Sequence, residues 1–375
     1  MEKGGVITDA IASQKWPGEA KVHVSIVNWV QSPPERPGWF TLDLQPVPDG
    51  IAADLVPLWL STLAARPLGA NKGVCFQGPI PVGDGFVLKE SEVTELLLLR
   101  DARYAQVVRP YLIGDDIVED PAQRPRRWII DFGLMPLEEA AGFPAALAIV
   151  RERVKPEREA NRREYYRRHW WRLGEPRPGL RAALTGLDRY LAVGRIAKRT
   201  LFIWCDAVWC PSDLVVVVAL DTDYAFGVLS SRPHELWARY RGSTLKGDPR
   251  YTNTTVFETF PWPQADLAAR EQIAAAARQV IVERARACAG VRGLTEVYNL
   301  VEDGGFTALA SAHRQLDAAA AAAYDWPAGI TDDPYEVIPR LMSLNADIAG
   351  GRPYNPFPDR ATTADRAPPL DPEPT

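Results

Sequence analysis

Hydrophobic and polar residues alternate near the start of the chain. Over residues 21–30, KVHVSIVNWV, the apolar positions Val22, Val24 and Ile26 are separated by other side chains that are mostly polar. This pattern predicts a half-buried β-strand, because successive side chains of a strand point to opposite faces. A second short strand is expected within residues 4–10. Two strands alone are marginal in water, so we expect them to finish a sheet whose other strands lie elsewhere or outside this chain.

The next part of the chain reads as a linker followed by short elements. Residues 31–50 contain five prolines, which predicts an extended linker over 32–50. Beyond it we expect a short helix near 51–64 and a buried strand in RWIIDFG at 127–133. A helix over 138–154 is expected to be interrupted by its proline.

The pattern then changes between helix and strand twice. We expect the best-formed helix at 156–172, where Pro156 suits the first turn and no glycine follows before Trp171. Three short apolar runs between residues 201 and 230, LFIWC, LVVVVAL and AFGVLS, are predicted strands. A helix should follow, with Ser230 or Ser231 at its N-cap and Pro233 in its first turn.

The C-terminal part is predicted to be helical. Apolar residues recur at helical spacing over 266–290, 305–324 and 336–349. From about residue 358 to 375 the chain is rich in Pro, Asp and Thr, and we expect this tail to be disordered. The fold class is therefore α+β: a mixed region of short strands and helices, followed by a helical C-terminal region.

Composition excludes several classes of protein. The chain has 375 residues, of which 46% are hydrophobic and 24% charged, so a disordered, collagenous or disulfide-rich chain is excluded. Its four cysteines make no disulfide framework, which favours a cytoplasmic location. No apolar run approaches the length of a membrane-spanning helix, and the first residues lack a signal-peptide layout.

A basic block stands out from an acidic chain. The net charge is −5, yet residues 151–200 carry 15 Lys and Arg against 6 Asp and Glu. Such a block is typical of a surface that binds a polyanion. A solvated helix with internal Glu–Arg pairs would give the same composition, and charge alone does not separate the two.

The familiar catalytic and metal-binding motifs are missing from the sequence. The four histidines are scattered, and Cys205 and Cys210 have no second pair to complete a zinc site, so two buried thiols are expected. The sequence contains no P-loop, dinucleotide fingerprint or nucleophile elbow. Two carboxylate pairs, Asp115–Asp116 and Asp221/Asp223, lie in turn-like contexts and are expected to cap turns rather than catalyse.

Two groups of side chains suit nucleic-acid binding. The basic block interleaves arginines with aromatic residues, and its cations can contact phosphate without any base geometry; we assign this role to Arg162, Arg167, Lys198 and Arg199. A second cluster follows the helix at 232–240. Its arginine and lysine side chains can donate to guanine O6 and N7, and its asparagine can pair with adenine; these residues are Arg239, Arg241, Lys246, Arg250 and Asn253. The alternative is that Arg250 and Tyr251 only hold this loop to the domain.

Several long segments together resemble one family. The chain is similar to the C-terminal half of MmeI-like (type IIL) restriction–modification N6-adenine DNA methyltransferases, almost continuously from Gly4 to about Phe357. The segments that carry the resemblance are WPGEAKVHVSIVNW, FQGPIPVGDGFVL, VVRPYLIGDDI, RWIIDFG, YAFGVLSSRPHELW, RYTNTTVFETFPWP and AHRQLDAAAAAAYDWP.

The resemblance implies an order of domains. Residues 1–31 correspond to the last strands of a class I methyltransferase domain, 32–50 to a linker and 51–265 to a DNA target recognition domain. Residues 266–357 correspond to a helical C-terminal domain and 358–375 to a disordered tail. The family's Gly-rich S-adenosylmethionine loop and its D/N-P-P-Y/F tetrapeptide are not in this sequence.

The expected function is therefore that of a recognition part. The resemblance implies that double-stranded DNA is the partner, with no membrane involved. We expect no catalytic residue, bound cofactor or metal in this chain, no methyl transfer by the chain alone, and truncation before the catalytic motifs. Two alternatives stay open: a stand-alone specificity module working with a separately encoded methyltransferase half, and an inactive gene remnant. Because their partner strands are missing, we expect the N-terminal strands to leave a sheet edge unpaired.

Overall fold

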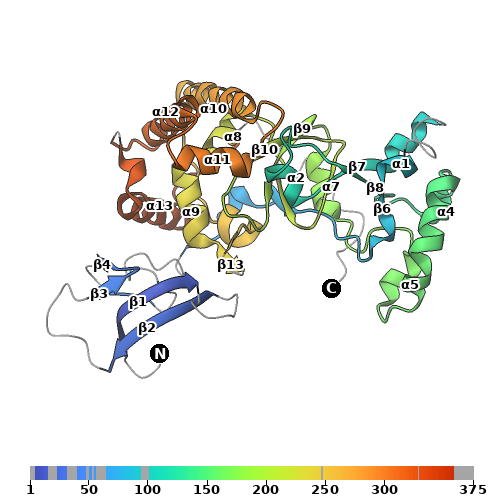
Figure 1. Ribbon diagram of the computed structural model, residues 1–375, viewed down its shortest axis with the longest axis horizontal. Coiled ribbons are helices and arrows are strands. Elements are labelled where there is room, and N and C mark those ends of the chain that lie inside the picture. Colours follow the sequence, from blue (N-terminus) through green and yellow to red (C-terminus); the bar gives the residue numbers. More distant parts are fainter. Residues whose placement is uncertain are drawn as a thin grey trace.

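A computed structural model describes residues 5–15, 23–31, 40–47, 50–52, 55, 65–93, 101–245, 248–327 and 329–358. The fold is α+β, with sheets of short strands and a group of helices formed by the C-terminal part (Figure 1). Figure 1 shows the N-terminal strands as a separate group at lower left, helices α8 to α13 at upper left, and α4 and α5 at the opposite end. The predicted fold class is confirmed.

The N-terminal sheet has four strands in the order β2-β1-β3-β4. Strand β1 (Val6–Lys15) pairs antiparallel with β2 (His23–Val30), which confirms the strand expected at 21–30, and pairs parallel with β3 (Phe40–Leu42). Among the described residues β2 has β1 as its one neighbouring strand, so it is an outer strand of this sheet. A small core of its own, made by Ile7, Ala10, Val47 and Ile51, supports this sheet.

Part of the expected linker is folded. Residues 40–47 form the hairpin of β3 with β4 (Gln45–Val47) rather than an extended connection. Both turn residues, Asp43 and Leu44, have positive φ angles, of 50° and 65°, and this backbone matches the twist of a two-residue hairpin. The prolines misled the prediction because Pro46 lies on an edge strand, where a missing N–H is tolerated. The helix expected at 51–64 falls almost wholly outside the described residues.

A second sheet, ordered β11-β7-β8-β6, has its own core. The predicted strand at 127–133 is its strand β8, where Ile129 and Ile130 are buried. Trp170 and Trp171 are also buried in this core. The strands are β6 (Val87–Leu88), β7 (Val108–Leu112), β8 (Arg127–Ile130) and β11 (Cys210–Pro211), and the nearby helices are α1 (Glu90–Val93), α2 (Gly114–Val118), α3 (Leu137–Ala140) and α4 (Pro144–Arg153). Helix α4 starts at Pro144, so the expected interruption is confirmed.

The helix expected at 156–172 is broken in two. Helix α5 (Lys155–Glu159) ends before Asn161, and α6 (Glu164–Arg168) begins after it. The Asn161 side chain accepts a hydrogen bond from the backbone N–H of Arg163 at 2.9 Å, an Asx turn that competes with helix continuation. Arg167 stabilises the break by donating to the carbonyl oxygens of Asn161 and Arg162.

A third sheet, ordered β10-β9-β12-β5, is antiparallel throughout. It contains two of the three runs predicted as strands between 201 and 230: β10 (Ile203–Asp206) and β12 (Val215–Val218), with β5 (Cys75–Gln77) and β9 (Arg189–Gly194). The prediction that the third run, AFGVLS, forms a strand is wrong. It lies in helix α8 (Asp223–Ser230), where the Thr222 side chain accepts from the Ala225 N–H as an N-cap.

The predicted C-terminal helices are confirmed. Helix α9 (Arg232–Arg241) follows an N-cap at Ser231, with proline in its first turn. The remaining helices are α10 (Leu267–Cys288), α11 (Leu294–Glu302), α12 (Thr307–Ala323) and α13 (Pro334–Ala349). A short helix, α7 (Pro178–Leu184), precedes β9.

These helices and the third sheet share one hydrophobic core. Tyr190 and Val217 from the sheet belong to the same buried cluster as Ile273, Leu316 and Leu341 from the helices. The division expected at residue 265/266 is therefore not a gap in packing, although the domain limits themselves stay a prediction.

Candidate nucleic-acid interface

The segment after helix α9 folds as a hairpin. Strand β13 (Ser243–Leu245) pairs antiparallel with β14 (Asp248–Arg250), where a loop was expected. The hairpin is fixed to the chain beyond β9: the Ala197 N–H donates to the Pro249 carbonyl at 3.3 Å, and the Tyr251 N–H donates to the Arg195 carbonyl at 2.9 Å. Ile196 and Arg250 form a bridge. Arg250 thus lies opposite Ile196, and Tyr251 lies opposite Arg195.

A buried histidine anchors the end of this hairpin. The Tyr251 hydroxyl contacts His234 Nε2 at 3.0 Å, and His234 Nδ1 contacts the Leu229 carbonyl at 2.8 Å. Since a carbonyl only accepts, Nδ1 carries the proton and Nε2 accepts from the tyrosine. Burial lowers the pKa of His234 to about 3, so the ring is neutral. Because Tyr251 follows Arg250 directly, this hydrogen bond also fixes the backbone position of Arg250.

Three arginines converge at this junction. Arg177 donates to Gln77 Oε1 at 3.4 Å, and Gln77 in turn donates to the Asp213 carbonyl at 2.8 Å. The backbone N–H of Arg195 donates to the carbonyl oxygen of Leu214, which is the residue after Asp213. Arg250 adds the third guanidinium group from the hairpin. We call Arg177, Arg195 and Arg250 the arginine cluster.

The electrostatics of the arginine cluster favour an anion. The pKa of Arg195 is lowered first by burial and next by the charge of Arg250, and Asp213 opposes this only in part. The Nε atom of Arg250 is buried and has no hydrogen-bond partner among the described residues. Buried donors without acceptors cost free energy, so this junction is suited to receive an acceptor from outside the chain.

The other residues predicted to read bases surround the hairpin. Arg239 is exposed on α9, and Arg241 donates to the Thr255 carbonyl at 3.3 Å. Asn253 is half-buried at the start of a π-helical turn, η7 (Asn253–Phe257). Lys246 lies outside the described residues. The sequence analysis missed Arg177 and Arg195. Arg177 precedes a proline, and Arg195 directly follows strand β9, which was not predicted.

The residues predicted to contact phosphate fall into two separate places. Arg162 and Arg167 are exposed around α6, beyond α5, whereas Lys198 and Arg199 face α11, which Figure 1 shows toward the other end of the molecule. Arg199 is not a free cation: its side chain is 12% exposed, pairs with Glu302 at 2.6 Å and donates to Asn299 at 2.9 Å. These contacts tie the strand junction to α11, and a phosphate contact by Arg199 stays a prediction.

Lys198 keeps more freedom than Arg199. Its ammonium group donates to Asn299 Oδ1 at 3.3 Å, and the residue is exposed. Both residues line a hollow of about 300 Å³ that also touches Ser212, Asp213 and Leu214. Because Arg195 bonds to Leu214, this hollow lies directly beside the arginine cluster.

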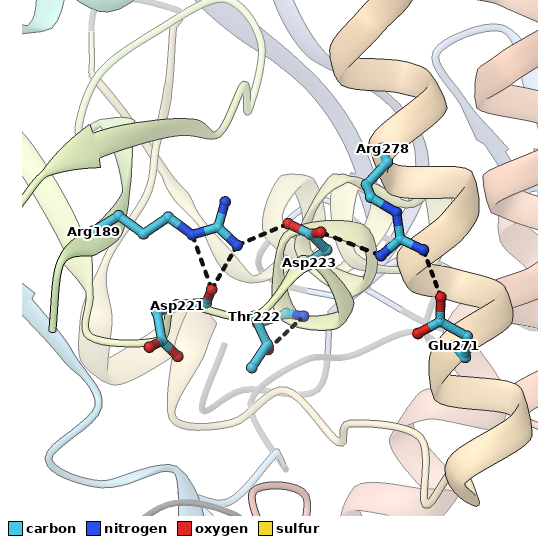
Figure 2. A network of polar contacts seen from close by, with 7 residues as sticks. Arg189, Asp221, Thr222, Asp223, Glu271 and Arg278 are labelled. Atoms are coloured by element: carbon cyan, nitrogen blue, oxygen red, sulfur yellow. Dashed lines mark hydrogen bonds and ion pairs between the residues drawn. The ribbon is translucent and has the colours of Figure 1, made fainter.

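The Asp221/Asp223 pair was expected to cap a turn, but the cap of α8 is Thr222 and the Asp223 carboxylate forms ion pairs instead. Figure 2 shows Asp223 between two arginines, with Arg189 of β9 at 2.9 Å and Arg278 of α10 at 3.3 Å. Arg189 also donates to the Asp221 carbonyl, and Arg278 reaches Glu271 at 2.5 Å. This network ties the third sheet to helices α8 and α10.

The second pair, at the start of α2, is likewise structural. The Asp116 carboxylate is buried, accepts from the Ile113 N–H at 3.2 Å and pairs with Arg126 at 3.1 Å. Asp116 thus caps this turn, as predicted.

The cysteines and the N-terminal sheet offer no further chemistry within the described residues. Cys205 and Cys210 are buried free thiols, as predicted, and burial raises the pKa of each. No group of three metal-ligating side chains occurs in the described part of the chain. Within the described residues, the N-terminal sheet contains no strand–helix–strand unit. No helix in the described ranges is long and apolar enough to cross a membrane.

Comparisons with known proteins agree with the resemblance seen in the sequence. Residues 188–264 match the family model described as MmeI, target recognition domain. This stretch runs from the loop before β9 to just beyond η7, and so includes Arg195, Arg250 and Asn253. No curated protein matches the chain.

A solved structure shares the fold. The type IIL restriction–modification enzyme MmeI, solved in complex with DNA, superposes with a TM-score of 0.72 at 18% sequence identity. The match covers 92% of this chain and 46% of MmeI. The chain therefore spans less than half the length of the protein it resembles, and the similarity extends well beyond the recognition stretch.

Proposed function

We propose that this chain recognises DNA, as the target-recognition part of a type IIL restriction–modification enzyme that methylates adenine at N6. The observation that carries the proposal is the match of residues 188–264 to the MmeI target recognition domain. The arginine cluster lies at that stretch, and the MmeI structure of the same fold is a complex with DNA. Half-buried arginines beside a hairpin are suited to a polyanion with structured grooves.

Methylation itself belongs, in this proposal, to a part outside the chain. The sequence lacks the donor loop and the D/N-P-P-Y/F tetrapeptide, and a flipped adenine needs a pocket beside the bound donor. S-adenosylmethionine would supply the methyl group there. We infer that the whole system works in the cytoplasm, where its DNA substrate is.

The edge of the N-terminal sheet supports a partner that completes it. Strand β2 is an outer strand and exposes Ile26, Val27, Trp29 and Val30. An unpaired apolar edge is a ready template for another strand. We propose that this partner is a methyltransferase half, encoded either in the same gene or separately.

DNA binding tests the main proposal. The affinity of the full chain for a labelled random-sequence duplex, measured by fluorescence anisotropy, should fall steeply with salt, by about 0.9 in log K per log salt for each neutralised phosphate. Arg162→Glu should weaken binding to all sequences alike. Arg286→Glu is the control, because this exposed arginine lies on α10 and pairs with Glu283. A flat salt dependence would remove DNA recognition as the function.

A second measurement separates the recognition part from a complete enzyme. Incubation of the chain with labelled S-adenosylmethionine and plasmid DNA should transfer no methyl groups. Addition of a motif-bearing methyltransferase half should restore transfer if the chain is a specificity module. An inactive remnant would neither bind DNA nor restore transfer, and transfer by the chain alone would contradict the proposed division of labour.

A further inference from the structure

We propose that a pocket between the second sheet and helix α7 binds a small molecule that joins one oxyanion group, a phosphate or a carboxylate, to an apolar body. The pocket is lined by Arg109 and Asp131 of the sheet and by Arg181 of the helix, and we call it the α7 pocket. Arg109 of strand β7 is the residue that holds the oxyanion. Binding there is separate from the proposed DNA recognition and does not depend on it.

The register of the second sheet brings Arg109 and Asp131 to one face. Arg109 of β7 lies opposite Ile129 of β8, and the side chains of such a pair point to the same side of a sheet. Asp131 comes two residues after Ile129, and its N–H donates to the Val107 carbonyl at 2.7 Å, so the pairing continues and Asp131 points to that side as well. Both side chains line the α7 pocket.

The carboxylate on this face is already occupied. Arg181 donates from Nη2 to both oxygens of Asp131, at 2.8 and 2.9 Å, and the Gly133 N–H donates to one of them at 2.9 Å. Burial alone would raise the pKa of Asp131, but the charges of Arg181 and Arg109 outweigh burial and lower it. Asp131 is therefore ionised, and its hydrogen bonds go to Arg181 and Gly133 rather than to Arg109.

Arg109 is left without a partner for its side chain. Among the described residues its guanidinium group forms no ion pair and donates no hydrogen bond, and its Nε atom is buried. A buried donor without an acceptor costs free energy, and more so when it is charged. Two guanidinium groups and one carboxylate line the α7 pocket, which leaves one positive charge in excess. Asp188 and Asp206, on the segments beside it, are exposed and do not line it.

The remaining walls of the α7 pocket are largely apolar. Leu180 and Leu184 of α7 form one wall, and Ala207 and Trp209 of the turn between β10 and β11 form another. Such walls favour an apolar or planar body next to the anionic group. The volume is about 250 Å³, which suits a small molecule because pockets for drug-sized ligands start at roughly 300 Å³. Thr185 is exposed and also lines the pocket, so the pocket opens to solvent at the end of α7.

Calorimetric titration of the full chain with phenyl phosphate and with benzoate tests the site, and benzyl alcohol is the uncharged probe. Both anions should bind, and benzyl alcohol should not. Arg109→Gln should lower the affinity for the anions by about tenfold or more, because a charge-assisted hydrogen bond is lost. Arg127→Gln is the matched control, since this arginine of the neighbouring strand β8 is exposed and does not line the pocket. Equal losses in the two variants, or no binding of either anion, would overturn the proposal.

Two further measurements separate binding from support of the fold. Because the Arg109 side chain has no partner to lose, Arg109→Gln should leave the melting temperature of the ligand-free chain unchanged or higher. Ala207→Phe adds a ring to the wall of the α7 pocket and should abolish binding of phenyl phosphate while Arg109 is kept. A lower melting temperature of Arg109→Gln with unchanged anion affinity would show that Arg109 only supports the fold. Unchanged affinity in Ala207→Phe would place the anion outside the pocket.

DNA binding keeps this site distinct from the proposed function. Arg109→Gln should bind a labelled random-sequence duplex as tightly as the wild type does, and excess duplex should not displace phenyl phosphate. If the duplex displaces phenyl phosphate and Arg109→Gln weakens the binding of both, the pocket receives a backbone phosphate of DNA and the small-molecule site is wrong. If the chain binds phenyl phosphate but no duplex, DNA recognition fails and the site stands.

Discussion

At the scale of single residues, Tyr251 is the link on which the hairpin depends. Its hydroxyl donates to His234 Nε2, and its backbone N–H donates to Arg195. Both the histidine and the tyrosine are buried, at 0% and 4% exposure. A change at this residue therefore acts on the stability of the core and on the arginine cluster at once.

Replacement of Tyr251 by Phe should destabilise the protein by about 1–3 kcal/mol, because it leaves a buried imidazole nitrogen without its donor. The free energy of unfolding, measured by urea denaturation, checks this. Tyr165→Phe is the control: that ring contacts Tyr166 and His169, but its hydroxyl has no hydrogen-bond partner in the described part of the chain. Equal losses for both variants would show that the hydrogen bond is not the cause.

A second residue links stability to pH. The Asp317 carboxylate accepts from the Arg232 N–H at 2.7 Å, at the start of α9, and burial raises its pKa to about 7. The folded chain therefore binds a proton that the unfolded chain releases near pH 4. Stability from this group is present below about pH 4 and is lost as pH rises toward 7.

Asp317→Asn should remove this dependence and keep the hydrogen bond, since an amide oxygen also accepts. The difference in unfolding free energy between the variant and the wild type should grow in favour of the variant from pH 5 to pH 8, by on the order of 1–2 kcal/mol for a group that is only partly buried. A constant difference for Asp317→Asn would contradict the raised pKa.

The residues of the site were predictable in kind but not in grouping. Chemistry alone identified Arg250 and Asn253, because few side chains can contact nucleic acid. It could not find that Arg195 and Arg177 join Arg250, or that Arg199 is occupied by Glu302. These pairings join residues far apart in sequence, and only the fold brings them together.

At the scale of elements, helices α8 and α10 approach closely at a glycine. A Cβ atom on Gly227 would lie 2.5 Å from Ile273 Cγ2 and 3.1 Å from Ala277 Cβ. Figure 1 shows the two helices side by side in the C-terminal group. The close approach explains why a residue with poor helix propensity occupies the middle of α8.

Gly227→Ala should destabilise the fold by about 1–3 kcal/mol through overpacking, although alanine favours helix. The melting temperature, followed by circular dichroism, checks this. Gly69→Ala serves as the control because a Cβ there meets nothing within 4 Å. A rise in melting temperature for Gly227→Ala would mean that the helices separate without cost.

The contrast between helices α8 and α10 shows why some elements could be predicted from the sequence and others could not. Helix α10 begins at a visible cap, with Asp266 accepting from the Ala269 N–H at 2.8 Å, and has one polar face, so its pattern was clear. Helix α8 is buried on nearly all sides, and a short apolar run of this kind looks the same as a buried strand. The break at Asn161 escaped prediction because a side chain, not a glycine or proline, ends the helix.

At the scale of the whole molecule, the exposed edge of the N-terminal sheet is the main liability. Among the described strands, β2 is an outer strand that carries exposed apolar side chains, including Trp29 at 63% exposure. Such an edge promotes pairing between molecules when its natural neighbour is missing. We therefore expect the isolated chain to self-associate as its concentration rises.

Trp29→Lys should reduce this association, since a charged residue on an edge strand opposes pairing. Size-exclusion chromatography with light scattering over a range of concentrations checks it. Leu44→Lys is the control, because Leu44 is 77% exposed but lies in the β3–β4 turn. If both variants self-associate to the same degree, the contact between molecules does not involve the edge of β2.

The shared core determines how specificity could be transplanted between relatives. Near the end of the recognition stretch, Trp262 packs against Phe357 with ring centroids 4.9 Å apart, and its backbone N–H donates to the Tyr354 hydroxyl. Asn345 of α13 donates to the Thr259 carbonyl and to the backbone of Arg66. A chimaera that took only residues 188–264 from this chain would leave behind the C-terminal residues that pack against Trp262 and bond to Thr259. New specificities should therefore arise by single changes on the hairpin or by inheritance of residues 65–358 as one block.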